Sequence, residues 1–400
     1  MKILYHHRTR AEDAQGIHIA EIQRAFRGLG HDVVEVALVP AGGATGVRKE
    51  PGAMVRAVSR AAAAVPGAGY EILELGGNAV TASKLVLAIR AAKPDLVYER
   101  YSLHNAAGAI ATKMAGVPLV LEVNSPLAEE RAAHGGLKFP RVAAKLERAI
   151  WRAATSIVTV STPLADVLVA AGVDRSRILV LPNAVRREMM TAGAGGAAIR
   201  TKHGFRSADV VFGFTGWFRP WHGLEQFLEA FADYGLSAMG ARVLLVGEGQ
   251  ALPALKDIVK RRGLGDSVAF TGAVGRDAIA DHIAAFDVAL QPHATRYASP
   301  MKIFEYLALG KPVIAASTPA IGEILTDGVD SILFQPGDTV GLVDGVRTLL
   351  RNRDLRARMS HDARATVRLR GFFWDENARR TLEHLARLTG GQTELVPEPS

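Results

Sequence analysis

The sequence contains no cysteine, which excludes disulfides, thiolate metal sites and cysteine nucleophiles together. Its first ten residues, MKILYHHRTR, hold only a short apolar stretch before the charged residues begin. A secretory signal needs an apolar segment of about 7–15 residues, and a membrane-spanning helix needs about 20. The chain offers neither pattern, so we expect a cytoplasmic protein.

The bulk composition is that of an ordinary globular protein, with 48% hydrophobic and 22% charged residues. At roughly 100–200 residues per domain, 400 residues indicate two domains. The formal net charge of +8 favours anionic partners such as nucleotide phosphates or an acidic membrane surface. Nucleic acid is disfavoured, because the sequence shows no zinc-finger spacing, no RNP-type aromatic motif and no dense basic tail.

Short β-rich runs alternate with helical patterns along almost the whole chain, which predicts an α/β fold. Two blocks of this kind predict two Rossmann-like domains with parallel sheets, facing each other across a ligand cleft at the carboxyl ends of the strands. Helices are predicted at 17–29, 85–92, 224–231 and 377–388. The predicted strands are 3–5, 33–36, 96–98, 117–123, 156–160, 178–181, 210–214, 243–246, 268–270, 288–290 and 313–316.

A stretch of small residues, TAGAGGAA at 191–198, has no hydrophobic period and is typical of a linker. We therefore place the domains at 1–185 and 186–370. Residues 371–400 would form a helix and a polar tail.

Gly16 is the first candidate for phosphate binding. It falls between the first predicted strand and the first predicted helix, where a glycine lets backbone N–H groups approach an anion. The segment lacks the GxGxxG pattern, so dinucleotide binding is not supported. A plain turn is the alternative.

The second candidate is the loop GWFRPWHG at 216–223, between a predicted strand and a predicted helix. Gly216 begins the turn, and Arg219 and His222 would add cationic donors where the helix dipole is already positive. A diphosphate leaving group would suit this place. The alternative is an aromatic-rich turn whose arginine pairs with a carboxylate.

The third candidate is the segment YASPMKIFEY at 297–306. Ser299 before a proline predicts a helix N-cap, and the N–H groups of Met301 and Lys302 would then point at an anion. Glu305 would lie about a turn and a half into the helix, placed for the paired hydroxyls of a ribose. A surface carboxylate is the alternative for Glu305.

The segment SPMKIFEYLALGKPVIA resembles the signature of the family-4 glycosyltransferases, which have the GT-B fold. Four other segments resemble that family in the same order: QGIHIAEIQRAFRGLGHDV, VLPNAV, LLVGEGQALPALK and VAFTGAV. The resemblance covers nearly the whole chain. It implies an acceptor-binding N-terminal domain, a C-terminal domain that binds the nucleotide-sugar, and a C-terminal helix that crosses back to the N-terminal domain.

The family resemblance also implies roles for particular residues. Glu305 would bind the donor ribose, and the amides of Met301 and Lys302 would hold the diphosphate. The loop containing Gly272 and Val274 would contact the base, and Gly16 would lie against the donor phosphate and the acceptor. The reaction would retain the anomeric configuration and need neither metal nor cofactor, with UDP as the favoured nucleotide.

The chain departs from the family pattern at several positions, which we interpret as a subgroup marked by SPxKxFEY and FRPWHG. The first glutamate of the family's E-x7-E motif falls on Tyr297, and the usual arginine and lysine of the phosphate clamp fall on Trp217 and His222. Arg219 would then supply the missing guanidinium. Asn124 takes the place of a frequent histidine and can bind a sugar hydroxyl without acting as a base.

The predicted function is transfer of a hexosyl group from a nucleotide-diphosphate sugar to a hydroxyl of a glycan, lipid-linked or small-molecule acceptor. Arg219, His222, Lys302 and Asn124 are the candidate catalytic residues. The alternatives are a sugar-nucleotide epimerase on the same fold and a non-catalytic sugar-nucleotide-binding subunit. Residues 138–152 predict a basic amphipathic helix that either contacts a membrane surface or packs on the core with a solvated basic face.

Overall fold

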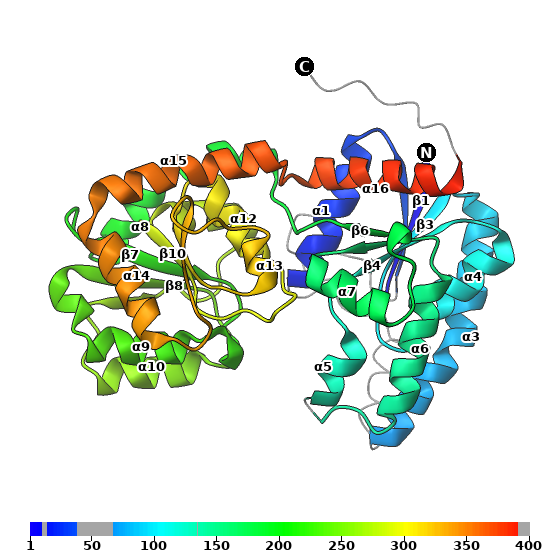
Figure 1. Ribbon diagram of the computed structural model, residues 1–400, viewed down its shortest axis with the longest axis horizontal. Helices are drawn as coiled ribbons and strands as arrows, with labels where there is room; N and C mark the ends of the chain where they lie inside the picture. Colours follow the sequence, from blue (N-terminus) through cyan, green and yellow to red (C-terminus); the bar gives the residue numbers. More distant parts are fainter. Residues whose placement is uncertain (10–13, 38–66, 134, 391–400) are drawn as a thin grey trace. The chain divides into compact units, whose positions relative to one another are not determined.

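The computed structural model describes residues 1–9, 14–37, 67–133 and 135–390 (Figure 1). The chain divides into two compact units. Unit 1 comprises Met1–Leu181 and Trp374–Ser400, and unit 2 comprises Pro182–Phe373. The division therefore falls four residues before the boundary that the sequence suggested, and three residues after it at the return to unit 1.

Unit 1 contains a parallel sheet of six strands in the order β2-β1-β3-β4-β5-β6. The strand order reverses beside β1, so β1 and β3 flank the point at which such sheets bind ligands. The strands are β1 (Lys2–His7), β2 (Asp32–Ala37), β3 (Leu96–Arg100), β4 (Leu119–Val123), β5 (Ser156–Thr159) and β6 (Ile178–Val180).

Except for the last one, the helices of unit 1 lie between its strands in the sequence, and they pack against its sheet. Helices α1 and α16 pack on one another, and α3 packs along α4 (Figure 1). Their bounds are α1 (Ala14–Gly28), α3 (Gly67–Ala92), α4 (Ala107–Ala115), α5 (Leu127–Ala133), α6 (Pro140–Ala153), α7 (Thr162–Ala170) and α16 (Trp374–Thr389), with the 3-10 turn η1 (Arg175–Arg177).

Unit 2 contains a second parallel sheet of six strands in the order β12-β11-β10-β7-β8-β9. Here the order reverses between β10 and β7, which is the doubly wound pattern of nucleotide-binding sheets. The strands are β7 (Val210–Thr215), β8 (Ala241–Val246), β9 (Val268–Phe270), β10 (Val288–Gln291), β11 (Val313–Ala316) and β12 (Ser331–Phe334).

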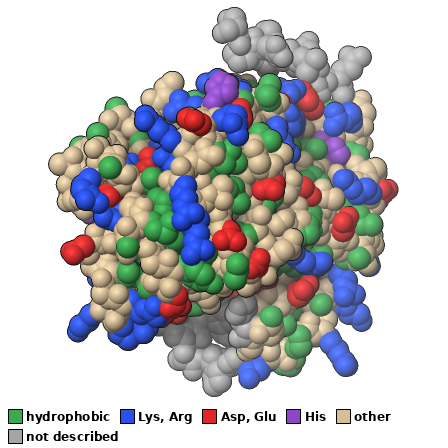
Figure 2. Space-filling model, turned by 60° about the vertical axis from the view of Figure 1, so that its left-hand side comes forward, with side chains coloured by type: hydrophobic (Ala, Val, Ile, Leu, Met, Phe, Trp, Pro, Cys, Tyr) green, Lys and Arg blue, Asp and Glu red, His purple; other side chains and the backbone are tan. Residues whose placement is uncertain are grey.

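Helices bury two hydrophobic clusters against the two faces of this sheet. They are α8 (Gly196–Lys202), α9 (Leu224–Asp233), α10 (Leu252–Arg261), α11 (Ile279–Ala284), α12 (Met301–Ala308), α13 (Pro319–Gly322), α14 (Thr339–Arg351) and α15 (Arg353–Arg370). The 3-10 turns are η2 (Arg187–Thr191), η3 (Pro220–His222), η4 (Leu236–Met239) and η5 (Arg276–Ala278). Figure 2 shows acidic and basic side chains interspersed over the face of the molecule that it presents.

The predicted strands are all present, with β12 in addition, but several predicted bounds are wrong. Helix α1 begins at Ala14 instead of residue 17, and α3 is 26 residues long although the sequence indicated only its last part. Strand β4 begins at Leu119 instead of residue 117. Helix α16 begins at Trp374 instead of residue 377.

The prediction of a linker at 191–198 is wrong, because this segment is packed into unit 2. Gly196 is buried, and a Cβ added there would lie 2.8 Å from the backbone of Ala284 on α11. The N–H of Gly195 donates to the Asp281 carboxylate at 2.8 Å. The small residues let α8 approach α11 closely, and they do not mark a flexible connection.

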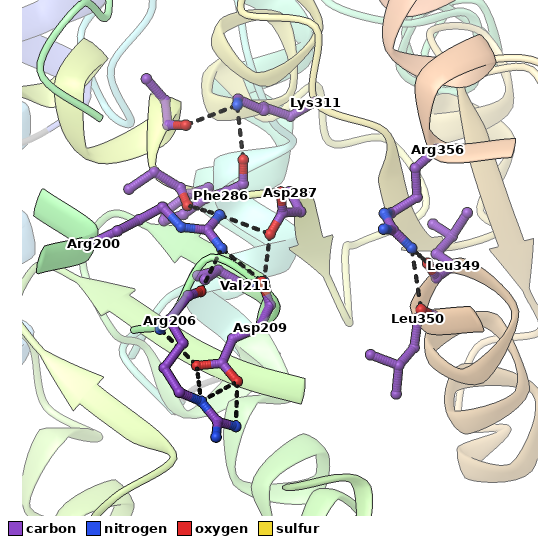
Figure 3. A network of polar contacts seen from close by, with 12 residues as sticks. Arg200, Arg206, Asp209, Val211, Phe286, Asp287, Lys311, Leu349, Leu350 and Arg356 are labelled. Carbon is purple, nitrogen blue, oxygen red and sulfur yellow. Dashed lines mark hydrogen bonds and ion pairs between the residues drawn. The ribbon is translucent and has the colours of Figure 1, made fainter. Parts of the chain in front are cut away.

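A polar network stabilises the edge of the unit 2 sheet at which the strands begin (Figure 3). Arg200 on α8 donates to the Asp287 carboxylate at 2.8 Å and to the carbonyl of Asp209 at 2.6 Å. Asp287 also accepts from the N–H of Val211 at 2.7 Å, and Lys311 donates to the carbonyls of Ala284 and Phe286. These residues lie at the ends of the strands remote from the candidate site.

Candidate active site

The candidate site lies in unit 2 at the carboxyl ends of β7 and β10, which are neighbours in the sheet. The loop 216–223 leaves β7, and the loop 292–300 leaves β10 and leads into α12. Ligands bind to doubly wound sheets at this reversal of strand order. The two most distinctive segments of the sequence therefore meet where the fold predicts a ligand.

Backbone segments from β7 and β8 touch one another beside this point, and they can do so only through glycine. A Cβ added to Gly247 would lie 2.0 Å from the carbonyl oxygen of Gly216. Gly216 itself has φ 127° and Gly247 has φ 132°, a region that other residues rarely adopt. The local backbone therefore requires a glycine at position 216, which is one of the predicted site residues.

Lys302 extends from the first turn of α12 toward β7. Its Nζ lies 3.8 Å from the centre of the Phe214 ring, and a Cβ on Gly216 would lie 3.2 Å from it. Burial lowers the pKa of Lys302 to about 7, although Glu305 acts in the opposite direction. Glu305 therefore offsets only part of the cost of burying the positive charge of Lys302 beside the β7 loop.

Helix α12 is fixed to β7 by the residue one turn after Lys302. The hydroxyl of Tyr306 accepts from the N–H of Thr215 at 2.8 Å and lies 3.1 Å from the Thr215 hydroxyl. Tyr306 is fully buried. This contact holds the amino end of α12 at the end of β7.

The surroundings of His222 favour its neutral form, in contrast to the cationic donor that the sequence indicated. Burial together with Lys302 and Arg219 lowers the pKa of His222 to about 3. The N–H of Arg219 donates to His222 Nδ1 at 3.3 Å. The proton of the neutral ring is then on Nε2, and a hydrogen bond from the ring to the backbone of Trp217 opposes part of the fall in the pKa.

Ser299 does not cap α12 as predicted, because another residue occupies its hydroxyl. The N-cap position of α12 is Pro300, and the Oγ of Ser299 accepts from the N–H of Asn183 at 2.9 Å. The Asn183 amide also donates to the Ser299 carbonyl at 2.5 Å. The N–H groups of Met301 and Lys302 remain in the first turn, where a helix provides no internal acceptor for them.

Glu305 is buried, which rules out the alternative of a surface carboxylate. Its side chain is 8% exposed, and its Oε1 lies 2.5 Å from Nη1 of Arg276 on η5. Sequence reasoning missed Arg276, because nothing in the local pattern indicates a partner 29 residues from Glu305. The sequence shows only that Arg276 follows directly after the predicted base-binding loop.

The predicted base-binding residues lie in the same region. Gly272 has φ 74°, and its carbonyl accepts from the N–H of Gly247 at 3.0 Å. Val274 packs against the hydrophobic cluster beneath the loop. The loops after β8 and β9 are therefore joined beside Arg276.

His293 is a second residue that the sequence analysis missed. It follows β10, and its carbonyl accepts from the Gln291 side chain at 2.6 Å. A Cβ on Gly223 would lie 3.4 Å from the Cβ of His293, and His293 helps to lower the pKa of His222. Its involvement depends on the pairing of β10 with β7, which local sequence does not reveal.

In unit 1, Asn124 belongs to a buried polar cluster around Glu122. The Asn124 amide donates to Glu122 Oε1 at 2.5 Å, and the Tyr98 hydroxyl donates to Oε2 at 2.9 Å. Arg100 also donates to Oε1. Burial raises the pKa of Glu122, but His18, Arg100 and these hydrogen bonds outweigh burial and hold the pKa below its ordinary value.

The remaining predicted residue of unit 1 is Gly16, which lies inside α1 instead of in the preceding turn. Glu99, at the neighbouring switch point, is fully buried. It lies 3.6 Å from His6 Nε2, and burial raises its pKa to about 8.

Helix α6 has the exposed basic face that the sequence predicted, with Arg141, Lys145 and Arg148 exposed. Ala143, Glu147, Ile150 and Trp151 are buried, while Val142 is 48% exposed. Arg152 donates to the carbonyl of Ala171. No helix in the described part of the chain is both long enough and apolar enough to cross a membrane.

Two protein-family models match most of this chain. The family "Glycosyl transferases group 1" matches residues 209–352, and "Glycosyl transferase 4-like domain" matches residues 14–184. A D-inositol 3-phosphate glycosyltransferase of Geodermatophilus obscurus is 30% identical over 370 residues, which are 86% of this chain and 80% of that one. The chain belongs to the family-4 glycosyltransferases.

An alpha-D-kanosaminyltransferase of Streptomyces kanamyceticus is 24% identical to this family-4 glycosyltransferase over 260 residues, 63% of this chain and 66% of the relative. The match thus spans about two thirds of that relative's length. The crystal structure of Anabaena Alr3699/HepE in complex with UDP-glucose is 20% identical and covers 97% of this chain and 100% of its own, with a TM-score of 0.72. The fold is therefore GT-B, as the motifs implied.

Across the described ranges, no cluster of three or more His, Asp or Glu side chains is arranged to hold a metal ion.

Proposed function

We propose that this glycosyltransferase transfers a hexosyl group from a UDP-sugar to an acceptor hydroxyl with retention of the anomeric configuration. One observation carries the proposal. The Lys302 ammonium, the 216–223 loop and the first-turn amides of α12 converge at the strand reversal of unit 2. Helix amides and a cation favour a diphosphate in this position.

The residues around the diphosphate would then bind the nucleoside. Glu305 would accept hydrogen bonds from the two ribose hydroxyls, with Arg276 holding one carboxylate oxygen in place. Gly272 and Val274 would contact the base through the backbone. UDP is the proposed nucleotide, and the description of Anabaena Alr3699/HepE, which has the same fold, in complex with UDP and with UDP-glucose supports this choice.

The chemistry would depend on electrostatic stabilisation. The bond between the sugar and the diphosphate breaks, and the acceptor attacks the oxocarbenium-like sugar from the same face. The departing phosphate oxygen takes the acceptor proton, so no protein base is needed. Lys302, Arg219 and the amides of Met301 and Lys302 would stabilise the developing negative charge, with neutral His222 beside them. One such preorganised donor is typically worth about 2.7–4 kcal/mol.

Acceptor contacts are assigned to unit 1. The Asn124 amide nitrogen is taken by Glu122, so the Asn124 carbonyl oxygen would be the atom that receives an acceptor hydroxyl. The acceptor is a glycan, a lipid-linked molecule or a small polyol. For a lipid-linked acceptor, the exposed Arg141, Lys145 and Arg148 of α6 would face the anionic membrane surface.

Hydrolysis of UDP-glucose, followed by time-resolved proton NMR, tests this proposal. Water then takes the place of the acceptor, and a retaining enzyme releases α-glucose before mutarotation. Initial release of β-glucose would contradict retention. A chain that binds UDP-glucose but neither hydrolyses nor transfers its sugar would be a non-catalytic subunit.

A further inference from the structure

The four tryptophans of the chain fall into two contrasting pairs. Trp151 and Trp374 are 2% and 5% exposed, as expected for the largest apolar side chain. Trp217 and Trp221 are 50% and 49% exposed, and both belong to the 216–223 loop at the candidate site. Two half-exposed indoles within five residues need an explanation that core packing does not supply.

The loop that carries these indoles is firmly anchored. Phe218, between them, is fully buried, and its N–H donates to the Glu248 carbonyl at 2.5 Å. The Phe218 carbonyl accepts from Ala251 at 3.0 Å, and a Cβ on Gly249 would lie 2.4 Å from the Phe218 backbone. The indoles therefore project from a backbone that is already fixed, which lowers the entropy cost of binding.

Arg219 lies between the two indoles. Its guanidinium carbon is 5.9 Å from the centre of the Trp217 ring and 5.4 Å from the centre of the Trp221 ring. Both distances fall within the range of cation–π attraction. Arg219 thus presents hydrogen-bond donors between two apolar surfaces, immediately beside the proposed diphosphate position.

This combination matches the chemistry of a sugar or cyclitol ring. Such a ring has an apolar C–H face, which packs against the electron-rich face of an indole, and a rim of hydroxyls that accept from a guanidinium. The nucleotide base is assigned elsewhere, to the loop after β9. Strand β8 separates β9 from β7 in the sheet. A ring held by the indoles would therefore not be the base.

We infer that Trp217 and Trp221, with Arg219 between them, form a subsite that stacks on the ring of a saccharide or cyclitol acceptor. The inference rests on the proposed function and adds an acceptor contact from the nucleotide-binding unit. Tyr234 provides a matched control, because it is 36% exposed and has Arg347 5.1 Å from its ring centre, yet it lies at the far end of α9.

Saturation-transfer NMR on the full chain loaded with UDP tests the inference, with methyl α-D-glucopyranoside and myo-inositol as probes. We expect transfer to the ring C–H protons of at least one probe. Trp217→Ala and Trp221→Ala should each weaken binding of that probe about tenfold. Trp217→Phe and Trp221→Phe should restore most of it, and Tyr234→Ala should bind like the wild type.

Two other results would overturn the inference. The first is that neither probe binds to the wild type. The second is that the alanine variants bind the probe as tightly as the wild type does. If the alanine variants instead lose only binding to vesicles containing phosphatidylglycerol, the indoles anchor a membrane surface.

UDP-glucose hydrolysis separates this inference from the proposed function. If the wild type neither binds nor hydrolyses UDP-glucose, the proposed function fails as well. If it hydrolyses UDP-glucose while the alanine variants retain probe binding, the acceptor subsite alone is wrong.

Discussion

The Lys302 ammonium lies 3.8 Å from the centre of the Phe214 ring. This cation–π contact joins a helix to a strand that is distant from it in the sequence. Phe214 is fully buried on β7, and Lys302 stands in the first turn of α12. The ring face stabilises the charge only in part, and burial lowers the lysine pKa to about 7. This pair connects the fold of unit 2 to the electrostatics of the proposed reaction.

The lowered pKa of Lys302 predicts the pH dependence of the reaction. The free enzyme loses this positive charge as pH rises through about 7, so kcat/KM for UDP-glucose should fall above that pH. Lys302→Arg should move the fall beyond the measurable range, because arginine stays charged. Measurement of kcat/KM from pH 5.5 to 9 checks this. A wild-type profile that is flat across neutrality would show that the Lys302 charge has no part in the rate.

Arg219→Ala should lower kcat by about 100-fold or more, since it removes a preorganised donor to the leaving group. Arg219→Lys should recover part of the loss. The control is Arg347→Ala, which removes an arginine that also lies over an aromatic ring, but outside the site. Steady-state kinetics with one donor suffice. Near wild-type turnover for Arg219→Ala would remove this residue from the mechanism.

Substitutions of Arg276 and Glu305, which form an ion pair, should have coupled effects on UDP binding. Glu305→Gln should weaken UDP binding about tenfold or more, because the ribose loses a charged acceptor. Arg276→Met should also weaken UDP binding, by releasing the carboxylate from its fixed position. Calorimetry on both single variants and the double variant gives the coupling energy. Strictly additive effects would mean that Arg276 does not act through Glu305.

Glu99 predicts a stability effect in unit 1. Its folded-state pKa is about 8, above the ordinary value of 4.5, so folding retains a proton that the unfolded chain releases. The resulting stability is present below pH 4.5 and is lost as pH rises through 8. The pKa of His6 is lowered to about 4, so its opposite effect is complete by about pH 6.5.

Glu147, Lys302 and Lys311 also have shifted pKa values of about 7 to 8, so the contribution of Glu99 is the difference between the wild type and Glu99→Gln in urea denaturation from pH 6.5 to 8.5. Glu99→Gln should remove about 2 kcal/mol of the decline in unfolding free energy over this range. The exposed Glu129→Gln serves as control and should keep the wild-type slope. An unchanged slope in Glu99→Gln would show that Glu99 is ionised in the folded protein.

The sequence predicted those features that depend on local pattern. The strands and the parallel sheets follow from hydrophobic period and from the alternation of strands with helices. Ser299 shows where this reasoning stops. Its environment predicts a cap, yet the N–H of Asn183, 116 residues away, occupies the hydroxyl.

The other errors have the same physical origin in tertiary contacts. Gly193, Gly195 and Gly196 resemble a linker until the close approach of α11 is known. Arg276 and His293 became site residues only through strand pairing and loop packing. The charge of His222 depends on burial beside two other cations, which no local motif encodes.

The most direct test of the account is calorimetric binding of UDP, GDP, ADP and dTDP to the wild type and to Glu305→Ala. The account predicts that UDP binds best and that Glu305→Ala weakens its binding at least about tenfold, as loss of a charge-assisted hydrogen bond pair implies. Equal binding of UDP by the wild type and the variant, or no binding of any nucleotide, would contradict the assignment of the donor site to α12.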